Sequence, residues 1–445
     1  MTEKIITRFA PSPTGLLHVG NIRTALFNYL FSLKFSGNFI LRIDDTDTQR
    51  SKEEYTNQII EDLNWLGVKV DKIFKQSERL EIYNKYFQDL IDKAFVYKCY
   101  ETPDELDSKR KRLVARRMPP IYDRASLFLS EQEIKKYIDE GRKPYWRFKL
   151  SGKRSNFDDL VRGEVSVDTS AQSDPVIVRE DGGFLYNLPS VIDDIDMGVT
   201  NIIRGEDHVT NSGIQIEMFE AIGKKPPTFG HHPLLVDENG EPFSKRNSAA
   251  SIKGLKEKNF EPMAVNSLNI SIGTSIEVNA FQSLEVISKE LELSQLGRAP
   301  ARFSMSQLFK LNSNILSRLD TEAVSERLNS IGAVMDEEIW EIIKSNINNL
   351  PEYKNWYNIV RGSIKVDDLD GDFMKLALDL LPPEPWGDDT WADWISKIKE
   401  SSDRKGKDLF LPLRRAITGL NAGPELKKII LLIGYNKVKN RLLGN

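Results

Sequence analysis

The chain has 445 residues, which is too long for one ordinary domain and predicts two to four. Hydrophobic residues make up 40% and charged residues 29%, which excludes collagen-like, low-complexity and wholly disordered chains. The net charge of −4, from 62 basic against 66 acidic residues, excludes a uniformly basic nucleic-acid coat but allows a local basic patch. No stretch approaches the roughly 20 apolar residues of a membrane span, so we expect a soluble, cytoplasmic protein with no membrane partner.

The first fifty residues predict a βαβ unit. Residues 5–9 form a short apolar strand, and 10–20 form a turn rich in proline and glycine. Residues 21–35 have apolar side chains at helical spacing, and 39–43 form a second apolar strand. A strand, a crossover helix and a second strand in so short a span indicate a parallel pair in an α/β domain.

Two amphipathic helices follow, near 59–66 and 80–91, and the pattern changes near Tyr97. We interpret residues 97–180 as an insertion, with a strand at 145–150 and a β-hairpin over 176–186. The apolar runs at 191–192, 202–203 and 233–236 then resume the α/β domain.

The chain is helical from about residue 250 onward, with few strand signals. We expect two helix-rich parts, one before and one after about 310, and a proline-rich loop at 382–385.

The first candidate site is the turn 11–21, PSPTGLLHVGN. It ends a strand and begins a helix, and a helix N-terminus with free N–H groups suits phosphate. Gly20 allows close approach of a ligand, and His18 can donate to a phosphate oxygen. Asn21 stands where a P-loop needs lysine, so this is no standard P-loop. Taken alone, a structural turn with a solvated histidine is the slightly favoured alternative.

The second candidate site is the loop 240–247, GEPFSKRN. A small loop with Ser244, Lys245 and Arg246 can fold over a triphosphate, and Lys245 can neutralise charge as phosphate bonds rearrange. On its own, a solvated turn with two charges is the better explanation.

Four polar residues, Arg8, Asp44, Tyr186 and Arg204, lie at or near the ends of apolar runs. In open α/β sheets ligands bind beyond the carboxyl ends of the strands. Two arginines and a tyrosine hydroxyl can hold a carboxylate, and an aspartate can hold an ammonium group. Ordinary surface ion pairing is the alternative.

A basic run at 109–117 has six basic residues in nine and is a candidate for contacts with a phosphate backbone. The alternative, a solvated charged face, is strong. The candidate residues are Lys109, Arg110, Lys111, Arg112, Arg116 and Arg117.

Together these features resemble glutamyl-tRNA synthetase, a class I aminoacyl-tRNA synthetase. Five segments match in order: 7–21 with the HIGH signature read as His18 to Asn21, 41–47 (LRIDDTD), 193–207, the PFSKR sequence where KMSKS belongs, and 405–426. The resemblance implies a Rossmann-like α/β catalytic domain, split by an insertion and followed by all-α stem-contact and anticodon-binding domains.

The resemblance also implies the reaction and the roles of residues. Glutamate and ATP form glutamyl-adenylate, and the 2′-hydroxyl of the terminal tRNA adenosine then takes the glutamyl group; the family tends to need tRNA for the first step. His18 and Lys245 would be catalytic, and Mg²⁺ should accompany ATP. The ATP site would comprise Pro11, Thr14, Gly15, His18, Gly20, Asn21, Ser244, Lys245 and Arg246. The glutamate site would comprise Arg8, Ser12, Asp44, Tyr186 and Arg204.

Three positions depart from the family pattern. Pro242 replaces the first lysine of KMSKS, and Asp44 stands where bacterial relatives more often have glutamate. Some relatives bind zinc in the insertion through several cysteines, whereas Cys99 is the only cysteine here. We therefore predict no zinc and no other metal held by protein ligands.

The expected domains are 1–96 with 181–245 (catalytic), 97–180 (acceptor-end insertion), 246–310 (stem contact) and 311–445 (anticodon binding). The partners implied are tRNA-Glu, L-glutamate and ATP, with a monomeric protein. Some relatives reject tRNA-Gln through an arginine of the anticodon domain that we cannot place in 353–361, where Trp356 is an equal candidate. Hence the hypothesis that tRNA-Gln is also charged.

Three rival interpretations remain. Glutaminyl-tRNA synthetase usually ends in β-barrel domains, which the helical tail disfavours. The short enzymes that glutamylate a tRNA base lack an anticodon domain. A tRNA-binding remnant with an impaired site is the alternative from a different class.

Overall fold

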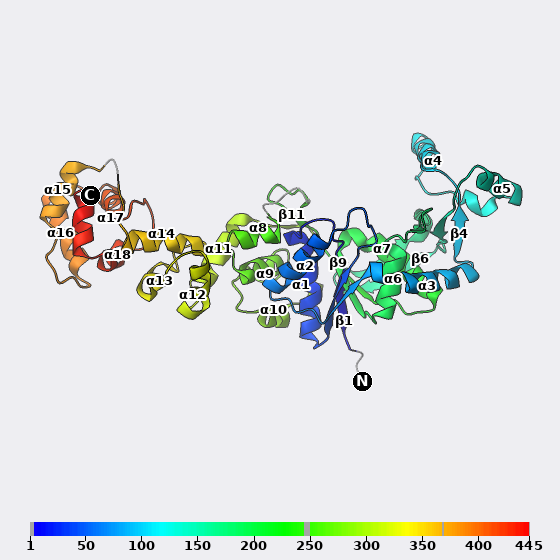
Figure 1. Ribbon diagram of the computed structural model, residues 1–445, viewed down its shortest axis with the longest axis horizontal. Coiled ribbons are helices and arrows are strands. Elements are labelled where there is room, and N and C mark those ends of the chain that lie inside the picture. Colours follow the sequence, from blue (N-terminus) through cyan, green and yellow to red (C-terminus); the bar gives the residue numbers. More distant parts are fainter. Residues whose placement is uncertain (1–3, 244–249, 367–368, 445) are drawn as a thin grey trace. The chain divides into compact units, whose positions relative to one another are not determined.

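The computed structural model describes residues 4–243, 250–366 and 369–444 (Figure 1). The chain forms two compact units. The first comprises Met1–Leu255 with Val265–Ser304, and the second comprises Lys256–Ala264 with Met305–Asn445. In the described ranges, no helix has both the length and the apolar character that crossing a membrane requires.

The first unit is built on a seven-stranded sheet of order β3-β2-β1-β9-β10-β6-β7. All neighbours are parallel except β6 and β7. The strands are β1 (Ile6–Phe9), β2 (Asn38–Ile43), β3 (Lys72–Lys75), β6 (Arg154–Asp159), β7 (Gly163–Asp168), β9 (Asn201–Gly205) and β10 (Thr228–His232).

The predicted βαβ unit is confirmed. β1 pairs in parallel with β2, and α1 (Val19–Lys34) connects them and packs against β1, β9 and α10 (Leu284–Glu290). The predicted helices after it are α2 (Glu53–Trp65) and α3 (Leu80–Asp92). β2 and β3 lie on one side of β1, and β9 and β10 lie on the other side. A topological switch point therefore lies between β1 and β9, and ligands bind at such points in open α/β sheets.

The first of the apolar runs expected to resume the α/β domain is a helix. The apolar run at Val191 and Ile192 lies in α6 (Asn187–Asp196), where both side chains are buried against α7 (Val209–Ile222) and α3. A short apolar run fits either a buried strand or a buried helix, and only its neighbours in space decide between them.

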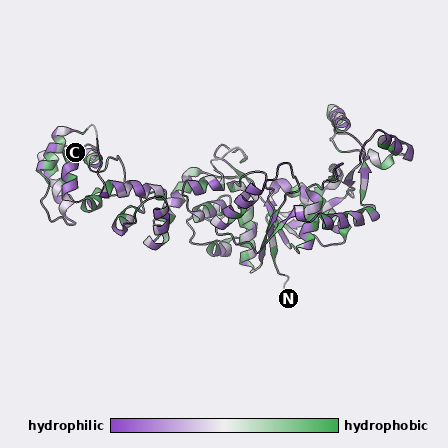
Figure 2. Ribbon diagram, viewed as in Figure 1, coloured by the Kyte–Doolittle hydropathy of each residue, from purple (hydrophilic) through white to green (hydrophobic). Residues whose placement is uncertain are grey.

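The segment expected as an insertion has a small sheet of its own. β4 (Val96–Cys99), β5 (Tyr145–Phe148) and β8 (Val176–Val178) are antiparallel. The helices α4 (Pro103–Ala115) and α5 (Glu131–Asp139) bury none of their residues, and Figure 2 shows α4 as predominantly hydrophilic. However, β6 and β7 belong to the large sheet, so part of 97–180 extends the catalytic core. The division into four domains stays a prediction.

The remaining elements of the first unit are short, and two of them, α8 (Ile252–Glu257) and α9 (Pro262–Ser271), include residues of both units. A parallel pair joins β11 (Leu235–Val236) and β12 (Ala301–Arg302).

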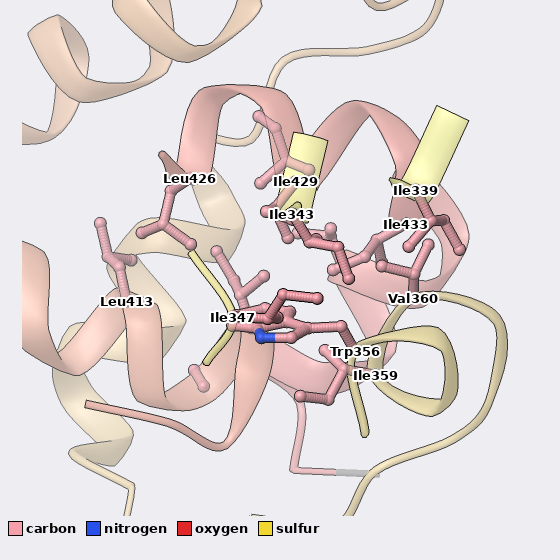
Figure 3. Packing of buried hydrophobic residues seen from close by; sticks show 14 of the residues in the cluster. Ile339, Ile343, Ile347, Trp356, Ile359, Val360, Leu413, Leu426, Ile429 and Ile433 are labelled. Atoms are coloured by element: carbon pink, nitrogen blue, oxygen red, sulfur yellow. The ribbon is translucent and has the colours of Figure 1, made fainter. Parts of the chain in front are cut away.

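The second unit is helical, as predicted, and has its own core. Trp340, Trp394 and Tyr353 are fully buried in it, and Figure 3 shows Trp356 among isoleucines and leucines of several helices. Its helices are α11 (Met305–Leu316), α12 (Thr321–Ser330), α13 (Glu337–Ile343), α14 (Leu350–Arg361), α15 (Gly371–Asp379), α16 (Thr390–Ser401), α17 (Lys407–Thr418), α18 (Leu426–Ile433) and α19 (Tyr435–Leu442).

Candidate active site

The residues predicted to bind an amino acid gather at the carboxyl edge of the large sheet. Arg8 lies near the end of β1, Asp44 directly follows β2, and Arg204 lies near the end of β9. Tyr186 immediately precedes α6, and its hydroxyl oxygen is 3.1 Å from Nη1 of Arg204. The structure therefore brings together at the switch point side chains up to 196 positions apart (204 − 8).

Buried carboxylates neutralise two of the arginines at this edge. Arg8 donates from Nε and Nη2 to both oxygens of Asp194, at 3.2 and 3.3 Å. Arg42 donates to both oxygens of Asp44, at 2.7 and 3.2 Å, and from Nη1 to Asp194 at 2.9 Å. Although burial alone would lower the pKa of Arg42, these carboxylates hold its pKa above the ordinary value. Asp44 is therefore already engaged by Arg42 before any substrate binds.

Sequence reasoning missed Arg42, Asp193 and Asp194. Asp193 is fully buried and accepts from Arg79 at 2.7 Å, and from Gln76 and Tyr83 at 2.8 and 2.9 Å. The available signal was the acidic pair at the end of an apolar run, because buried carboxylates need partners. Periodicity does not indicate which arginines supply them.

Arg204 differs from Arg8 and Arg42 because its partners are neutral. It is 4% exposed and donates from Nη2 to Ser212 Oγ at 2.5 Å and to Gln215 Oε1 at 2.8 Å. Among the described residues it forms no ion pair, and its buried Nε has no hydrogen-bond partner. Burial lowers the pKa of Arg204, as expected for a cation without a neighbouring anion in contact. This arrangement is suited to an incoming carboxylate.

His18 begins α1 and caps it. Its Nδ1 accepts from the Gly20 backbone N–H at 3.1 Å, while the Asn21 side chain accepts from the His18 N–H at 3.2 Å. Because Nδ1 accepts, the proton of the neutral ring lies on Nε2, which is thereby a donor suited to a phosphate oxygen. The capping explains why histidine, glycine and asparagine occur together at this turn.

The other residues predicted at this turn lie close to β2. Pro11 accepts the Asp44 N–H at 3.0 Å, and the Thr14 N–H donates to the Ser12 carbonyl at 2.8 Å. Ser12 is exposed, whereas Thr14 and Gly15 are half-buried. The turn is thus attached to the edge that carries Asp44.

The predicted residues Ser244, Lys245 and Arg246 lie outside the described residues. The chain on each side of them contacts His18. The Phe243 ring stacks on the His18 ring with centroids 6.2 Å apart, and Ser251 forms an antiparallel bridge with His18. The Ile252 N–H donates to the Leu17 carbonyl at 3.0 Å.

The basic run forms the second half of α4 and the two residues after it, and most of it is exposed. Lys109 pairs with Glu101 and Asp123, and Lys111 pairs with Asp107. The four arginines of the run form no ion pair within the described ranges and are exposed: Arg110, Arg112, Arg116 and Arg117.

Cys99 is buried, with its sulfur 3.7 Å from the Tyr122 hydroxyl. Glu101 accepts from Tyr122 and Ser126, both at 2.8 Å, so hydrogen bonds link these side chains. In the parts of the chain that the structure describes, no group of three or more His, Cys, Asp or Glu residues could hold a metal ion. The absence of zinc stays a prediction.

Comparison with protein families identifies two regions of the chain. The family described as tRNA synthetases class I (E and Q), catalytic domain, matches residues 4–310. The family described as anticodon binding domain matches residues 367–444.

Full-length relatives and solved structures agree with these matches. The chain is 46% identical to glutamate–tRNA ligase 1 of Brucella ovis and to glutamate–tRNA ligase 2 of Brucella melitensis, over 98% of this chain and 99% of each relative. A crystal structure of a glutamate tRNA ligase from Elizabethkingia meningosepticum, in complex with its amino acid, superposes with a TM-score of 0.84 at 26% identity over 99% of both chains. The glutamate–tRNA synthetase of Elizabethkingia anophelis gives 0.83 at 27% identity, also over 99% of both chains. The predicted family and fold class are confirmed: the chain belongs to the glutamate–tRNA ligases, which are class I aminoacyl-tRNA synthetases.

Proposed function

We propose that this enzyme ligates L-glutamate to tRNA-Glu in two ATP-dependent steps, with Arg204 as the anchor for the substrate's side-chain carboxylate. The observation that carries this assignment is a buried guanidinium with neutral partners only and an unused Nε. A buried cation without an anion is costly, and a bound carboxylate removes that cost through charge-assisted hydrogen bonds. The Tyr186 hydroxyl, 39% exposed as a residue, completes the anchor.

The other residues of the glutamate site act around this anchor. Arg8, whose charge is neutralised by Asp194, contributes hydrogen-bond donors on the side-chain carboxylate side. Ser12 and Asp44 face the amino-acid head, and the hydrogen bond from Asp44 to Pro11 keeps them together. Because Arg42 already binds Asp44, an ammonium group there shares that carboxylate with Arg42.

His18 and Lys245 act on the ATP phosphates in this proposal. An oxygen of the glutamate α-carboxylate attacks the α-phosphorus, and the bond to pyrophosphate breaks. The N–H of His18 Nε2 and the Lys245 ammonium stabilise the charge that moves onto the phosphates. His18 contacts Phe243 and Ser251, which flank residues 244–249 in the chain, and these contacts support assigning His18 and Lys245 to one ATP site. Pro11, Thr14, Gly15, Gly20, Asn21, Ser244 and Arg246 complete the ATP site.

The second step transfers the glutamyl group to tRNA. The 2′-hydroxyl of the terminal adenosine attacks the adenylate's carbonyl carbon, and AMP leaves with the bonding electrons. No side chain forms a covalent intermediate, so catalysis consists of positioning and electrostatics. The buried carboxylates of Asp44, Asp193 and Asp194 are engaged by arginines and so do not offer a metal site. Mg²⁺ would therefore bind together with ATP, where it would neutralise phosphate charge.

The tRNA partner is proposed to contact both units. The unpaired arginines of the basic run would bind the acceptor end, and the region 367–444 would bind the anticodon. We also propose a monomeric, cytoplasmic enzyme.

Charging of tRNA-Gln remains a second proposal about substrate range. Trp356 is 5% exposed and packs in the core of the second unit, so it is not available to read a nucleotide. Arg361 is bound to Asp336 at 2.7 Å. Trp356 has no guanidinium, and the guanidinium of Arg361 is bound to Asp336, so neither residue is suited to reject tRNA-Gln. Transcripts of both tRNAs decide the point: glutamylation of tRNA-Glu alone would refute the proposal.

Glutamate-dependent ATP–pyrophosphate exchange, with and without tRNA-Glu, tests the main proposal. Exchange that needs the tRNA is expected. Arg204→Gln should raise the KM for glutamate, and Lys245→Ala should abolish exchange while tRNA binding persists. A complete lack of exchange in the unmodified enzyme would favour an impaired tRNA-binding remnant and make Pro242 the first suspect. Loss of tRNA binding in Lys245→Ala would show that Lys245 has a different role.

A further inference from the structure

Behind Arg204, three buried side chains form a continuous chain of hydrogen bonds. Arg204 Nη2 lies 2.5 Å from Ser212 Oγ, and Ser212 Oγ lies 2.7 Å from Nε2 of His231. Nδ1 of His231 lies 2.5 Å from Asp159 Oδ2. Ser212 and His231 are 0% exposed, and Asp159 is 6% exposed. The three come from α7, β10 and the end of β6.

The direction of each hydrogen bond follows from Asp159. Burial alone would raise the pKa of its carboxyl, but hydrogen bonds from the His231 ring and from the His231, Val161 and Arg162 N–H groups hold the pKa below its usual range. An ionised carboxylate only accepts, so His231 Nδ1 donates to it. Burial lowers the pKa of His231 as well, so the ring is neutral and Nε2 accepts.

This polarity determines what Ser212 offers to Arg204. Ser212 Oγ lies 3.3 Å from the His208 carbonyl and 2.7 Å from His231 Nε2, and the shorter contact takes its single hydroxyl proton. Oγ therefore presents only lone pairs to the guanidinium. The chain therefore holds Arg204 firmly without placing an anion against it. A carboxylate in the place of Ser212 would hold Arg204 equally well but would neutralise it, as Asp194 does for Arg8.

The order Asp159, His231, Ser212 resembles a nucleophilic triad, but the geometry excludes that role. Ser212 Oγ has no exposure and is already bonded to both Arg204 and His231. A nucleophile must reach its substrate, and this hydroxyl cannot.

We propose that Asp159, His231 and Ser212 are positioning residues that hold Arg204 for recognition of a side-chain carboxylate and against a side-chain carboxamide. This inference rests on the proposed role of Arg204. A fixed guanidinium offers only donors, so it can donate to a carboxylate oxygen of glutamate, whereas the NH₂ group of glutamine would place a second donor against it. An Arg204 free to turn away would lose that discrimination.

The test compares Ser212→Ala and His231→Asn with the unmodified enzyme in tRNA-dependent ATP–pyrophosphate exchange. His231→Asn keeps a donor for Asp159 but removes the acceptor for Ser212. Each variant should raise the KM for glutamate by about ten- to a hundredfold, the effect expected from removing a hydrogen bond to a charged group, with the KM for ATP unchanged. The ratio of kcat/KM for glutamate to that for glutamine should fall by a similar factor. Ser212→Thr, which keeps the hydroxyl, should restore both.

Thr24→Val is the matched control. Thr24 Oγ1 lies 2.9 Å from Nε2 of His232, so this variant also removes a hydroxyl bonded to a buried β10 histidine. The other ring nitrogen of His232 bonds to the Pro233 carbonyl and not to Arg204. The KM for glutamate should stay unchanged in this variant. If Thr24→Val and Ser212→Ala raise it equally, the effect is general loosening of the core and the proposal is wrong.

Arg204→Gln separates this proposal from the one it rests on. If Arg204→Gln leaves the KM for glutamate unchanged, Arg204 is not the carboxylate anchor and the proposed function fails at that residue. If Arg204→Gln raises the KM but Ser212→Ala and His231→Asn do not, only the positioning proposal fails. In the Arg204→Gln background, Ser212→Ala should cause no further rise.

Discussion

At position 20 any side chain larger than hydrogen meets the His18 ring. A Cβ at Gly20 would lie 3.0 Å from both Cε1 and Nδ1 of His18, which is closer than ordinary van der Waals contact. The same ring nitrogen accepts the Gly20 N–H. The glycine is thus required because the residue two positions earlier folds back over it to cap the helix.

Gly20→Ala should displace the His18 ring and lower kcat for ATP–pyrophosphate exchange by about ten- to a hundredfold, since small misplacements of a catalytic group have effects of this size. Circular dichroism should show an unchanged helix content. Gly371→Ala, at the first position of α15 with nothing within 4 Å, is the control and should keep full activity. Equal activity of the two variants would contradict the role assigned to Gly20.

At the scale of the element, α6 carries acidic residues with very different environments. Asp194 is 2% exposed and bonds to Arg8 and Arg42, whereas the Asp196 side chain is 44% exposed and pairs with Arg79. Loss of a buried partner leaves an uncompensated charge, while an exposed pair contributes little.

Asp194→Asn should therefore destabilise the first unit by about 3–5 kcal/mol, against about 0–1 kcal/mol for Asp196→Asn. Hydrogen exchange of α6 peptides at a series of urea concentrations measures both. Similar destabilisation in the two variants would show that the buried network contributes no more than a surface pair.

Strand β10 should make stability depend on pH. Burial lowers the pKa of His232 from 6.5 to about 3, and it lowers the pKa of His231 as well. In weak acid the unfolded chain binds protons that the folded chain does not, so stability is complete above pH 6.5 and falls as the pH decreases below it. Each such histidine contributes a slope of about 1.4 kcal/mol per pH unit.

His232→Gln should reduce the mean slope between pH 6.5 and 5 by about 1 kcal/mol per unit. Urea unfolding followed by hydrogen exchange of β10 peptides gives the free energy at each pH. A variant with the slope of the unmodified protein would mean that His232 is protonated in the fold.

At the scale of the whole molecule, the charges are unevenly distributed. The net charge is −4, yet α4 and the residues after it expose arginines without ion-pair partners in the described residues. Binding of a polyanion to such a patch releases counterions, so the affinity for tRNA should fall steeply with salt.

Replacing Arg116 and Arg117 with glutamine should reduce the slope of log K against log salt by about 1.4–1.8, because each phosphate that an arginine neutralises adds about 0.7–0.9 to that slope. Filter binding of tRNA-Glu at several salt concentrations measures this slope. The control replaces Lys224 and Lys225 with glutamine, which changes the net charge equally. These two lysines precede β10 and lie near the amino ends of the strands, whereas the candidate site lies at the carboxyl ends. If both pairs alter the slope alike, net charge and not the basic run governs binding.

The sequence by itself determined the family, the βαβ unit, the helical second unit and the positions of His18, Arg8, Asp44 and Arg204 at strand or helix ends. The elements follow from local patterns, since hydrophobic periodicity and capping residues act over a few positions. The family follows from five motifs that match in order along the chain. Only the tertiary structure decided that Asp194 neutralises Arg8 from 186 positions away and that Arg204 keeps its charge unpaired. The reason is physical: ion pairs and hydrogen bonds between buried side chains depend on which elements meet in space, and that information is absent from local spacing.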